Sequence, residues 1–366
     1  MCGIVGYIGN REAFPIIIKG LKRLEYRGYD SAGITLFGKA GKTFKTKGKV
    51  ADLERLAANN TNAGNTLGLG HTRWATHGIP SDKNAHPHLS NTGRISIIHN
   101  GIIENYASLK KILIENGYRF KSDTDTEVLV NLIEYIKLSQ DVKIGQAVQI
   151  ALNQVIGAYA IAVFDLDRPE EIIVAKLGSP LAIGLGTDEY FIASDASPFI
   201  EYTNRTIYLD DNEMAVISRD KGFKMYSIPS DKALTPKIQE IQLSLEKIEK
   251  AGYDHFMLKE IHEQPTAITD TFRGRLLIDK HTINISGIEQ HLDVFKNADR
   301  ITIVACGTSW HAGLVAEYLF EDAARIPVEV EYASEFRYRN PVINKGDIVI
   351  QVIDKNSVWK LGLAGR

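Results

Sequence analysis

Hydrophobic and polar positions alternate in short runs over residues 1–220 of the chain. Runs of this kind are LGLGHTRWA, RISIIHNGII, YAIAVFDLD, EIIVAKL and YFIASD, and Gly, Asn and Asp residues separate them. This alternation predicts strands joined by turns. Two longer stretches, AFPIIIKGLKRLEY and TEVLVNLIEYIKL, repeat apolar residues at three-to-four spacing, which predicts helices. We therefore expect an α+β domain in which two long helices cover strand layers.

The pattern changes after residue 220. Residues 221–250 are polar and rich in lysine, which predicts a hairpin followed by a linker. Over residues 251–353, the helical stretch EIHEQPTAITDTFRGRL precedes the strand ITIVACGTS, the helical stretch WHAGLVAEYLFEDAARI and the strands VEVEYA and GDIVIQVI. Alternation of strand and helix predicts a second domain, an α/β domain with a parallel sheet.

Composition narrows the class of protein. A chain of 366 residues exceeds what one core usually holds, which agrees with two domains. The 43 Lys+Arg against 45 Asp+Glu offer no basic excess for a nucleic-acid backbone or an anionic membrane. The sequence shows no signal-peptide pattern and no apolar run long enough to span a bilayer. The 2 cysteines lie far apart, which fits a reducing compartment. We expect a cytoplasmic globular protein without nucleic-acid or membrane partners and without a cofactor.

One cysteine directly follows the initiator methionine in MCGIVGYIGN. If Met1 is removed, Cys2 carries both a thiol and a free α-amino group. Because an α-amino group has a pKa of about 8, it can accept the proton of the thiol. The alternation in GIVGYIG predicts a strand built into a sheet, whereas an ordinary disordered end is the alternative. Cys2 is therefore a candidate nucleophile.

Other polar clusters could complete a site around this thiol. In HTRWATHG, Arg73 offers a planar fork for a carboxylate, and a surface ion pair is the alternative. In KSDTDTEVL, Asp123 or Thr124 caps the following helix, and Asp125 could face a pocket and hold an ammonium group. No acidic or thiol residue joins the nearby histidines at ligand spacing, so we predict structural hydrogen bonds and no metal site for His71, His77, His86 and His88.

Two further motifs each allow a structural and a chemical interpretation. The pair Asn100-Gly101 in IIHNGIIEN is typical of a tight turn, but it could also form an oxyanion hole from an amide side chain and a backbone N–H. In the second domain, Cys306, Gly307, Thr308 and Ser309 end a strand and open a helix, where backbone N–H groups suit a sugar phosphate. The alternative there is a helix N-cap by Thr308 or Ser309. We expect Cys306 to be buried at the end of its strand and not to act as a nucleophile.

Together these stretches carry a resemblance to a known family. MCGIVGYIG, RLEYRGYDSAG, HTRWATHG, NAHPH, HNGIIEN and SDTDTEV resemble the glutaminase domain of the glutamine–fructose-6-phosphate aminotransferases. CGTSW and ASEFRYR resemble the start of the sugar isomerase (SIS) domain of the same family. The resemblance implies a four-layer αββα sandwich of the N-terminal-nucleophile type, followed by an α/β SIS domain. It also implies an aminotransferase of amino sugar biosynthesis that hydrolyses L-glutamine and aminates fructose 6-phosphate.

The resemblance also assigns roles to residues of this chain. Cys2 corresponds to the nucleophile, and Asn100 and Gly101 to the oxyanion donors. Arg73 and Asp125 correspond to the residues that hold the α-carboxylate and the α-ammonium group of glutamine. The remaining residues of glutamine binding that the resemblance implies are Arg27, Trp74, Thr76 and His77. The full-length family members imply a homodimer.

The end of the chain departs from this family. After GDIVIQVI the family has a second phosphate-binding stretch of the type SQSGET, whereas this sequence reads DKNSVWKLGLAGR. We therefore expect an incomplete SIS domain over residues 251–353, a non-matching tail over 354–366 and glutaminase activity at most. A non-catalytic sugar-phosphate-binding or interaction fragment is the alternative function, and a misfolded truncation product is a third possibility.

Overall fold

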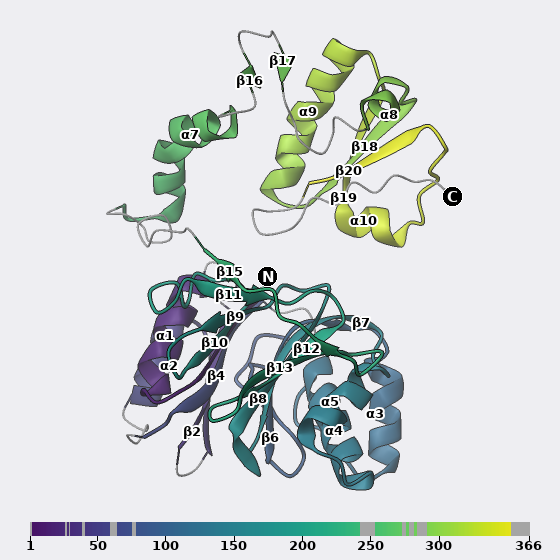
Figure 1. Ribbon diagram of the computed structural model, residues 1–366. Helices are drawn as coiled ribbons and strands as arrows, with labels where there is room; N and C mark the ends of the chain where they lie inside the picture. Colours follow the sequence, from purple (N-terminus) through teal and green to yellow (C-terminus); the bar gives the residue numbers. More distant parts are fainter. Residues whose placement is uncertain are drawn as a thin grey trace. The chain divides into compact units, whose positions relative to one another are not determined.

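The computed structural model describes residues 2–25, 28, 30–38, 41–58, 64–74, 78–241, 253–272, 276–277, 282–283 and 291–352. The chain divides into two compact units, Met1–Gly252 and Tyr253–Arg366, each of which is described by itself (Figure 1). The finer boundaries placed from the sequence at residues 220 and 353 stay predictions.

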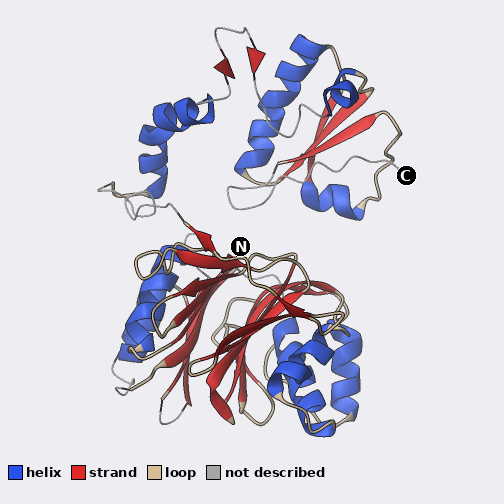
Figure 2. Ribbon diagram, viewed as in Figure 1, coloured by secondary structure: helices blue, strands red, loops and turns tan. Residues whose placement is uncertain are grey.

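In the described part of the first unit, the strands form two antiparallel sheets that face each other (Figure 2). The first sheet has the strand order β15-β11-β9-β10-β1-β4-β2-β3. Its strands are β15 (Gln239–Glu240), β11 (Arg205–Tyr208), β9 (Ala182–Leu185), β10 (Tyr190–Ala193), β1 (Gly3–Ile8), β4 (Leu67–Arg73), β2 (Ser31–Phe37) and β3 (Gly41–Lys47). The second sheet has the order β14-β13-β12-β8-β7-β6-β5. Its strands are β14 (Ala233–Leu234), β13 (Gly222–Ser227), β12 (Glu213–Ser218), β8 (Arg168–Leu177), β7 (Gly157–Asp165), β6 (Ile95–Ile103) and β5 (His88–Leu89).

Helices cover the outer face of each sheet, which gives the four layers αββα (Figure 1). On the first sheet lie α1 (Ala13–Leu24) and α2 (Val50–Ala58). On the second sheet lie α3 (Tyr106–Glu115), α4 (Asp125–Ser139) and α5 (Ile144–Leu152). Three buried clusters fill the spaces between these layers, one between the two sheets and one under each helical layer. The predicted α+β sandwich is confirmed.

The start of the chain lies in the centre of the first sheet. Strand β1 pairs with β10 on one side and with β4 on the other, and all its residues are buried. Because side chains alternate across a strand, Ile4 and Ile8 pack between the sheets while Val5 and Tyr7 pack under α1. The prediction of an N-terminal strand built into a sheet is confirmed, and it places Cys2 next to the core.

Two sequence interpretations of this unit need correction. The pattern predicted two helices before residue 220, but α2, α3 and α5 are also helical. The interpretation of Asn100-Gly101 as a tight turn is also wrong. Both residues lie within β6, opposite Ala160 and Tyr159 of β7. The pairing with a long neighbouring strand outweighs the local turn preference of the dipeptide.

The second unit contains a parallel sheet, as predicted. In its described residues β18 (Arg300–Ala305) lies between β19 (Val328–Tyr332) and β20 (Asp347–Gln351), and both neighbours run parallel to it. Its helices are α7 (Phe256–Phe272), α8 (Leu292–Lys296), α9 (Thr308–Ala324) and α10 (Ala333–Tyr338), and β16 (Leu276–Leu277) pairs with β17 (Thr282–Ile283). Of the helices in the described ranges, none has the length and apolar character needed to cross a membrane.

Candidate active site

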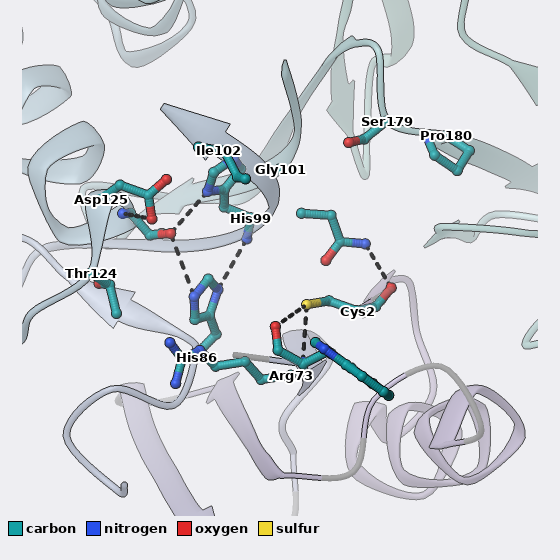
Figure 3. Close-up of a pocket in the computed structure, with 13 residues that line it drawn as sticks. Cys2, Arg73, His86, His99, Gly101, Ile102, Thr124, Asp125, Ser179 and Pro180 are labelled. Carbon is teal, nitrogen blue, oxygen red and sulfur yellow. Dashed lines mark hydrogen bonds between the residues drawn. The ribbon is translucent and has the colours of Figure 1, made fainter. Parts of the chain in front are cut away.

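A cavity of about 310 Å³ lies in the first unit, beside Cys2 (Figure 3). Its walls come from the start of β1, the end of β4, the middle of β6, the N-terminus of α4 and the connection between β8 and β9. The residues that line it are Cys2, Arg73, Trp74, His86, His99, Asn100, Gly101, Ile102, Thr124, Asp125, Thr126, Ser179 and Pro180. Five of the residues singled out from separate sequence motifs, Cys2, Arg73, Asn100, Gly101 and Asp125, therefore meet in one cavity, together with Trp74.

The thiol of Cys2 is held by the backbone of Trp74. The N–H of Trp74 donates to Cys2 Sγ at 3.2 Å, and the thiol lies 3.4 Å from the carbonyl oxygen of the same residue. Burial raises the pKa of the Cys2 thiol, while the N–H of Trp74 and the charge of Arg73 oppose that rise. The raised pKa favours the protonated thiol, so a nucleophilic role for Cys2 would require a base that removes this proton.

The amide of Asn100 lies beside this residue. Asn100 Nδ2 donates to the carbonyl oxygen of Cys2 at 3.0 Å, and Asn100 Oδ1 lies 2.9 Å from Nε2 of His71. The next residue, Gly101, has a φ of +141°, and a Cβ atom there would lie 2.0 Å from the carbonyl oxygen of Ala158. Only glycine fits this backbone position, so the wall of the cavity is bare backbone next to an amide side chain.

Opposite charges line the same cavity (Figure 3). Arg73 is the last residue of β4 and its side chain is buried, with Nη2 donating to the carbonyl oxygen of Gly78 at 3.1 Å. Burial lowers the pKa of Arg73, although the acidic groups of Asp30 and Asp125 oppose this shift. The guanidinium stays charged because an ordinary arginine pKa lies far above neutral pH.

Asp125 is the first residue of α4, and its carboxylate accepts backbone N–H groups from Ile103 at 2.8 Å and from Thr126 at 3.0 Å. The helix begins there because Thr124, the N-cap, accepts a hydrogen bond from the backbone of Glu127. The predicted capping role of Thr124 is confirmed. The N-terminus of a helix carries a partial positive charge, which favours an acidic side chain at this position.

Four buried histidines pack at one side of the cavity, and two of them, His86 and His99, line it. The rings of His71 and His86 stack with centroids 4.2 Å apart, and His86 meets His88 edge to face at 4.8 Å. Thr126 Oγ1 lies 2.9 Å from His99 Nδ1 and 3.4 Å from His86 Nε2, and Thr124 Oγ1 lies 3.1 Å from His88 Nε2. Burial lowers the pKa of His71 to about 3 and lowers the pKa of His86 and His88 well below the ordinary value. The rings of His71, His86 and His88 are therefore neutral hydrogen-bonding groups, as predicted.

Several other site predictions have different outcomes. Arg27, Thr76 and His77 lie outside the described residues, so their roles stay predictions. Trp74 lines the cavity with a side chain that is 51% exposed. Sequence reasoning missed His86, His99, Ile102, Thr124, Thr126, Ser179 and Pro180 as lining residues. His99, Ile102, Thr124 and Thr126 stand beside predicted site residues in HNGII and DTDTE, and His86 lies in the family motif NAHPH. Nothing in GSP indicated Ser179 and Pro180.

The CGTS stretch lies in the second unit, between β18 and α9. It ends a strand and opens a helix as predicted, but Cys306 is exposed rather than buried. The strand ends at Ala305, so Cys306 lies in the connection beyond the buried part of the sheet. The capping interpretation also needs correction, because Gly307, with a φ of 59°, is the N-cap of α9 and no side chain caps it. Thr308 and Ser309 are already helical residues. Within the described residues, no group of three His, Cys, Asp or Glu side chains could hold a metal ion.

The architecture and the site define the class of protein. A four-layer αββα sandwich, with a thiol at the start of a central strand beside an amide donor, is the arrangement of N-terminal-nucleophile amidotransferases. The profile of the glutamine amidotransferase domain matches residues 57–253, and that of the SIS domain matches residues 294–357. The chain belongs to the glutamine amidotransferase domain family.

Named relatives agree with the resemblance seen in the motifs. The chain is 56% identical over 354 residues to a glutamine–fructose-6-phosphate aminotransferase (isomerizing) of Bacteroides thetaiotaomicron, covering 96% of this chain and 57% of the relative. It is 54% identical to the enzyme of the same name in Chlorobaculum tepidum, covering 96% of this chain and 58% of the relative. The chain thus spans little more than half the length of these relatives.

A solved structure supports the fold. The glutamine phosphoribosylpyrophosphate amidotransferase of B. subtilis, complexed with ADP and GMP, matches with a TM-score of 0.54 at 25% identity. The match covers 90% of this chain and 65% of that chain. The N-terminal-nucleophile type predicted from the motifs is confirmed.

Proposed function

We propose that this chain hydrolyses the side-chain amide of L-glutamine to glutamate and ammonia, with Cys2 as the nucleophile. The observation that carries the proposal is the convergence of the Cys2 thiol, the Asn100 amide, Arg73 and Asp125 on one cavity of about 310 Å³. Hydrolysis of the glutamine side chain requires a thiol to attack the amide carbon and an amide donor for the oxyanion. Binding of its α-amino acid group requires a cation for the carboxylate and an anion for the ammonium group.

In the first half of the proposed reaction, Cys2 Sγ bonds to the amide carbon of glutamine. Loss of Met1 frees the α-amino group of Cys2, which accepts the thiol proton. This base is needed because burial raises the pKa of the thiol. The oxyanion that forms accepts hydrogen bonds from Asn100 Nδ2, which has a second N–H besides the one donated to Cys2, and from the backbone N–H of Gly101.

In the second half, the carbon–nitrogen bond breaks and the α-ammonium group gives its proton to the departing nitrogen, so that ammonia leaves and a glutamyl thioester remains. Water then attacks the thioester carbonyl while the α-amine takes a proton from that water. The carbon–sulfur bond breaks, the proton returns to sulfur and glutamate is released. Every atom of the two products is accounted for by glutamine and one water.

Specificity for glutamine comes from the two ends of its α-amino acid group. Arg73 pairs with the α-carboxylate through its planar fork, and Asp125 pairs with the α-ammonium group. A ligand with only one of the two charges leaves a buried partner without its counter-charge, which opposes its binding. Arg27, Trp74, Thr76 and His77 are included in the proposed glutamine site on the basis of the family motifs.

We further propose that the ammonia serves to aminate fructose 6-phosphate, with Cys306, Gly307, Thr308 and Ser309 binding the sugar phosphate. The support is the name of the relatives, of which this chain covers 57% of the length, and the position of the stretch at the N-terminus of α9. The same proposal includes a cytoplasmic location, because a nucleophilic thiol persists in a reducing compartment. It also includes a homodimer, which the resemblance to the full-length family members implies. Light scattering tests the dimer, and calorimetric titration with fructose 6-phosphate tests the sugar site.

The decisive experiment is intact-mass spectrometry of the purified protein before and after incubation with diazo-oxo-norleucine, an electrophilic glutamine analogue. The proposal expects a mass lower by one methionine, a single adduct that glutamine prevents, and glutamate formation that Cys2→Ala abolishes. Retained methionine, or glutamate formation by Cys2→Ala at the wild-type rate, would overturn it.

A further inference from the structure

The amide of Asn100 is fixed at both of its polar atoms. Nδ2 donates one hydrogen to the carbonyl oxygen of Cys2 at 3.0 Å, and Oδ1 lies 2.9 Å from Nε2 of His71. The same His71 nitrogen lies 3.1 Å from the carbonyl oxygen of His99. Since both oxygens only accept, Nε2 of His71 must carry a proton and donate it. With Oδ1 engaged in this way, the amide cannot rotate by half a turn without losing two hydrogen bonds.

The ring of His71 is held in the required tautomer. Its other nitrogen, Nδ1, is buried and has no hydrogen-bond partner among the described residues. A proton on Nδ1 would place a second N–H without an acceptor in a buried position, which is costly. The ring is also fixed in orientation by stacking on His86 with centroids 4.2 Å apart. His71 is therefore a neutral ring of fixed orientation that donates its Nε2–H toward Asn100 Oδ1 and the carbonyl oxygen of His99.

The contact joins the two sheets of the sandwich. Leu67 and Leu69 of β4 pack between the sheets, and side chains alternate across a strand, so His71 continues the same inward row. Ile98 of β6 packs between the sheets as well, and Asn100 continues that row from the other side. At this end of the sandwich a polar pair takes the place of the apolar contacts. One partner belongs to the sheet that carries Cys2, and the other belongs to the sheet that carries the oxyanion donors.

His71 does not line the cavity, so it does not touch the substrate. We propose that His71 is a positioning residue of the glutaminase site: its Nε2–H holds the Asn100 amide so that the free N–H of Nδ2 faces the developing oxyanion. The inference rests on the proposed function, because the oxyanion exists only if Cys2 attacks an amide. It adds a residue of the opposite sheet whose action on the reaction passes entirely through Asn100.

The test compares His71→Leu, which removes the donor, with His71→Gln, whose amide nitrogen can occupy the place of Nε2. Loss of an oxyanion donor lowers kcat by about 10²–10³, and loss of its positioning should cost about tenfold or more. We expect His71→Leu to lower kcat by that amount while KM for glutamine changes less than about twofold, since Arg73 and Asp125 still hold the substrate. His71→Gln should recover most of the rate.

His88→Leu is the matched control, because His88 is buried in the same cluster but lies against Thr124 instead of Asn100. It should leave kcat within about twofold. A double variant gives the sharper readout: if His71 acts through Asn100, His71→Leu should lower kcat no further in an Asn100→Ala background. Additive losses, or an unchanged kcat in His71→Leu, would overturn the inference.

A measurement on the wild-type protein covers the case in which His71→Leu does not fold. Nitrogen-15 spectra of labelled histidines at neutral pH should show His71 as the Nε2–H tautomer, and an Nδ1–H tautomer would contradict the inference. The two proposals fail differently. If the wild type forms no glutamate in a Cys2-dependent way, both the proposed function and the role of His71 are rejected. If the wild type is active and His71→Leu is equally active, only the role of His71 is rejected.

Discussion

The carboxylate of Asp125 accepts a hydrogen bond of 2.8 Å from the backbone N–H of Ile103. This contact joins the N-terminus of α4 to the end of β6, the strand that carries Asn100 and Gly101. The anion that we assign to the substrate ammonium group is therefore fixed to the same strand as the oxyanion donors. Because Asp125 is bonded to the strand that carries the oxyanion donors, the fold sets the distance between the carboxylate that binds the ammonium group and the donors that bind the oxyanion.

Asp125→Asn tests the charge at this position. The amide can still accept one backbone hydrogen bond, but it presents an NH₂ group to the other donor and has no charge for the ammonium group. Hydrogen bonds to charged groups contribute about 1.5–3 kcal/mol, so KM for glutamine should rise about tenfold to a hundredfold with a smaller change in kcat. Steady-state glutaminase assays measure both constants. Asp123→Asn is the control, because Asp123 is exposed and pairs with Lys83, and an unchanged KM in Asp125→Asn would contradict the assignment.

Gly101→Ala tests the backbone of the oxyanion wall. The residue has a φ of +141°, and its new Cβ would lie 2.0 Å from the carbonyl oxygen of Ala158, so β6 or β7 must shift. We expect a loss of at least about 2 kcal/mol in the free energy of unfolding and a large drop in kcat. Gly93→Ala is the matched control, since Gly93 has a φ of +77° with nothing within 4 Å. It should cost only about 1 kcal/mol, and urea denaturation that finds equal losses would contradict the steric argument.

Arg73→Lys tests the fork that we assign to the substrate carboxylate. Lysine keeps the charge but offers no planar pair of donors, and in this buried place its ammonium group is poorly solvated. KM for glutamine should rise by about tenfold or more, because a bidentate contact becomes a single one. Arg94→Lys is the control, since Arg94 is exposed and pairs with Asp167 away from the cavity. A wild-type KM in Arg73→Lys would remove Arg73 from the carboxylate site.

The parts of the fold that local pattern determines could be predicted. GIVGYIG alternates strictly enough to place β1 in a sheet, and Thr124 before an apolar periodic stretch places the start of α4. The helix α3 was missed because its Ile112 and Ile114 are exposed, which weakens the amphipathic pattern. In α9 the cap was misplaced because Gly307 has a left-handed conformation that sequence preference for Thr or Ser at the N-cap does not reveal.

Contacts across the sandwich could not be predicted in the same way. Asn100-Gly101 has the local signature of a turn, and only pairing with β7 makes it part of a strand. His71, His86 and His99 come from three separate segments, and their contacts depend on how two sheets pack. The family motifs marked the chemical groups of the site, but the support behind those groups is a property of the packed structure.

The buried histidines give the protein a distinctive dependence of stability on pH. In the unfolded chain a histidine binds a proton below a pKa near 6.5, whereas burial lowers the folded pKa of His71 to about 3 and also lowers the pKa of His86 and His88. The unfolded state then binds more protons than the folded state. Stability is therefore fully present above about pH 6.5 and falls as the pH decreases from there toward about 3.

His71 alone should lower the free energy of unfolding of the first unit by about 2 kcal/mol between pH 7.5 and pH 5, and the lowered pKa of His86 and of His88 should add to this fall. The pKa of Asp123 and of Asp167 lies below an ordinary 3.8, so these acids titrate below this window, whereas burial lowers the pKa of Lys45 to about 8, above it. Urea denaturation at several pH values measures the slope. His88→Gln should reduce the proton uptake on unfolding by about one. A flat profile from pH 7.5 to 5 would mean that the folded histidines take up protons as readily as the unfolded ones, in conflict with a neutral cluster behind Asn100.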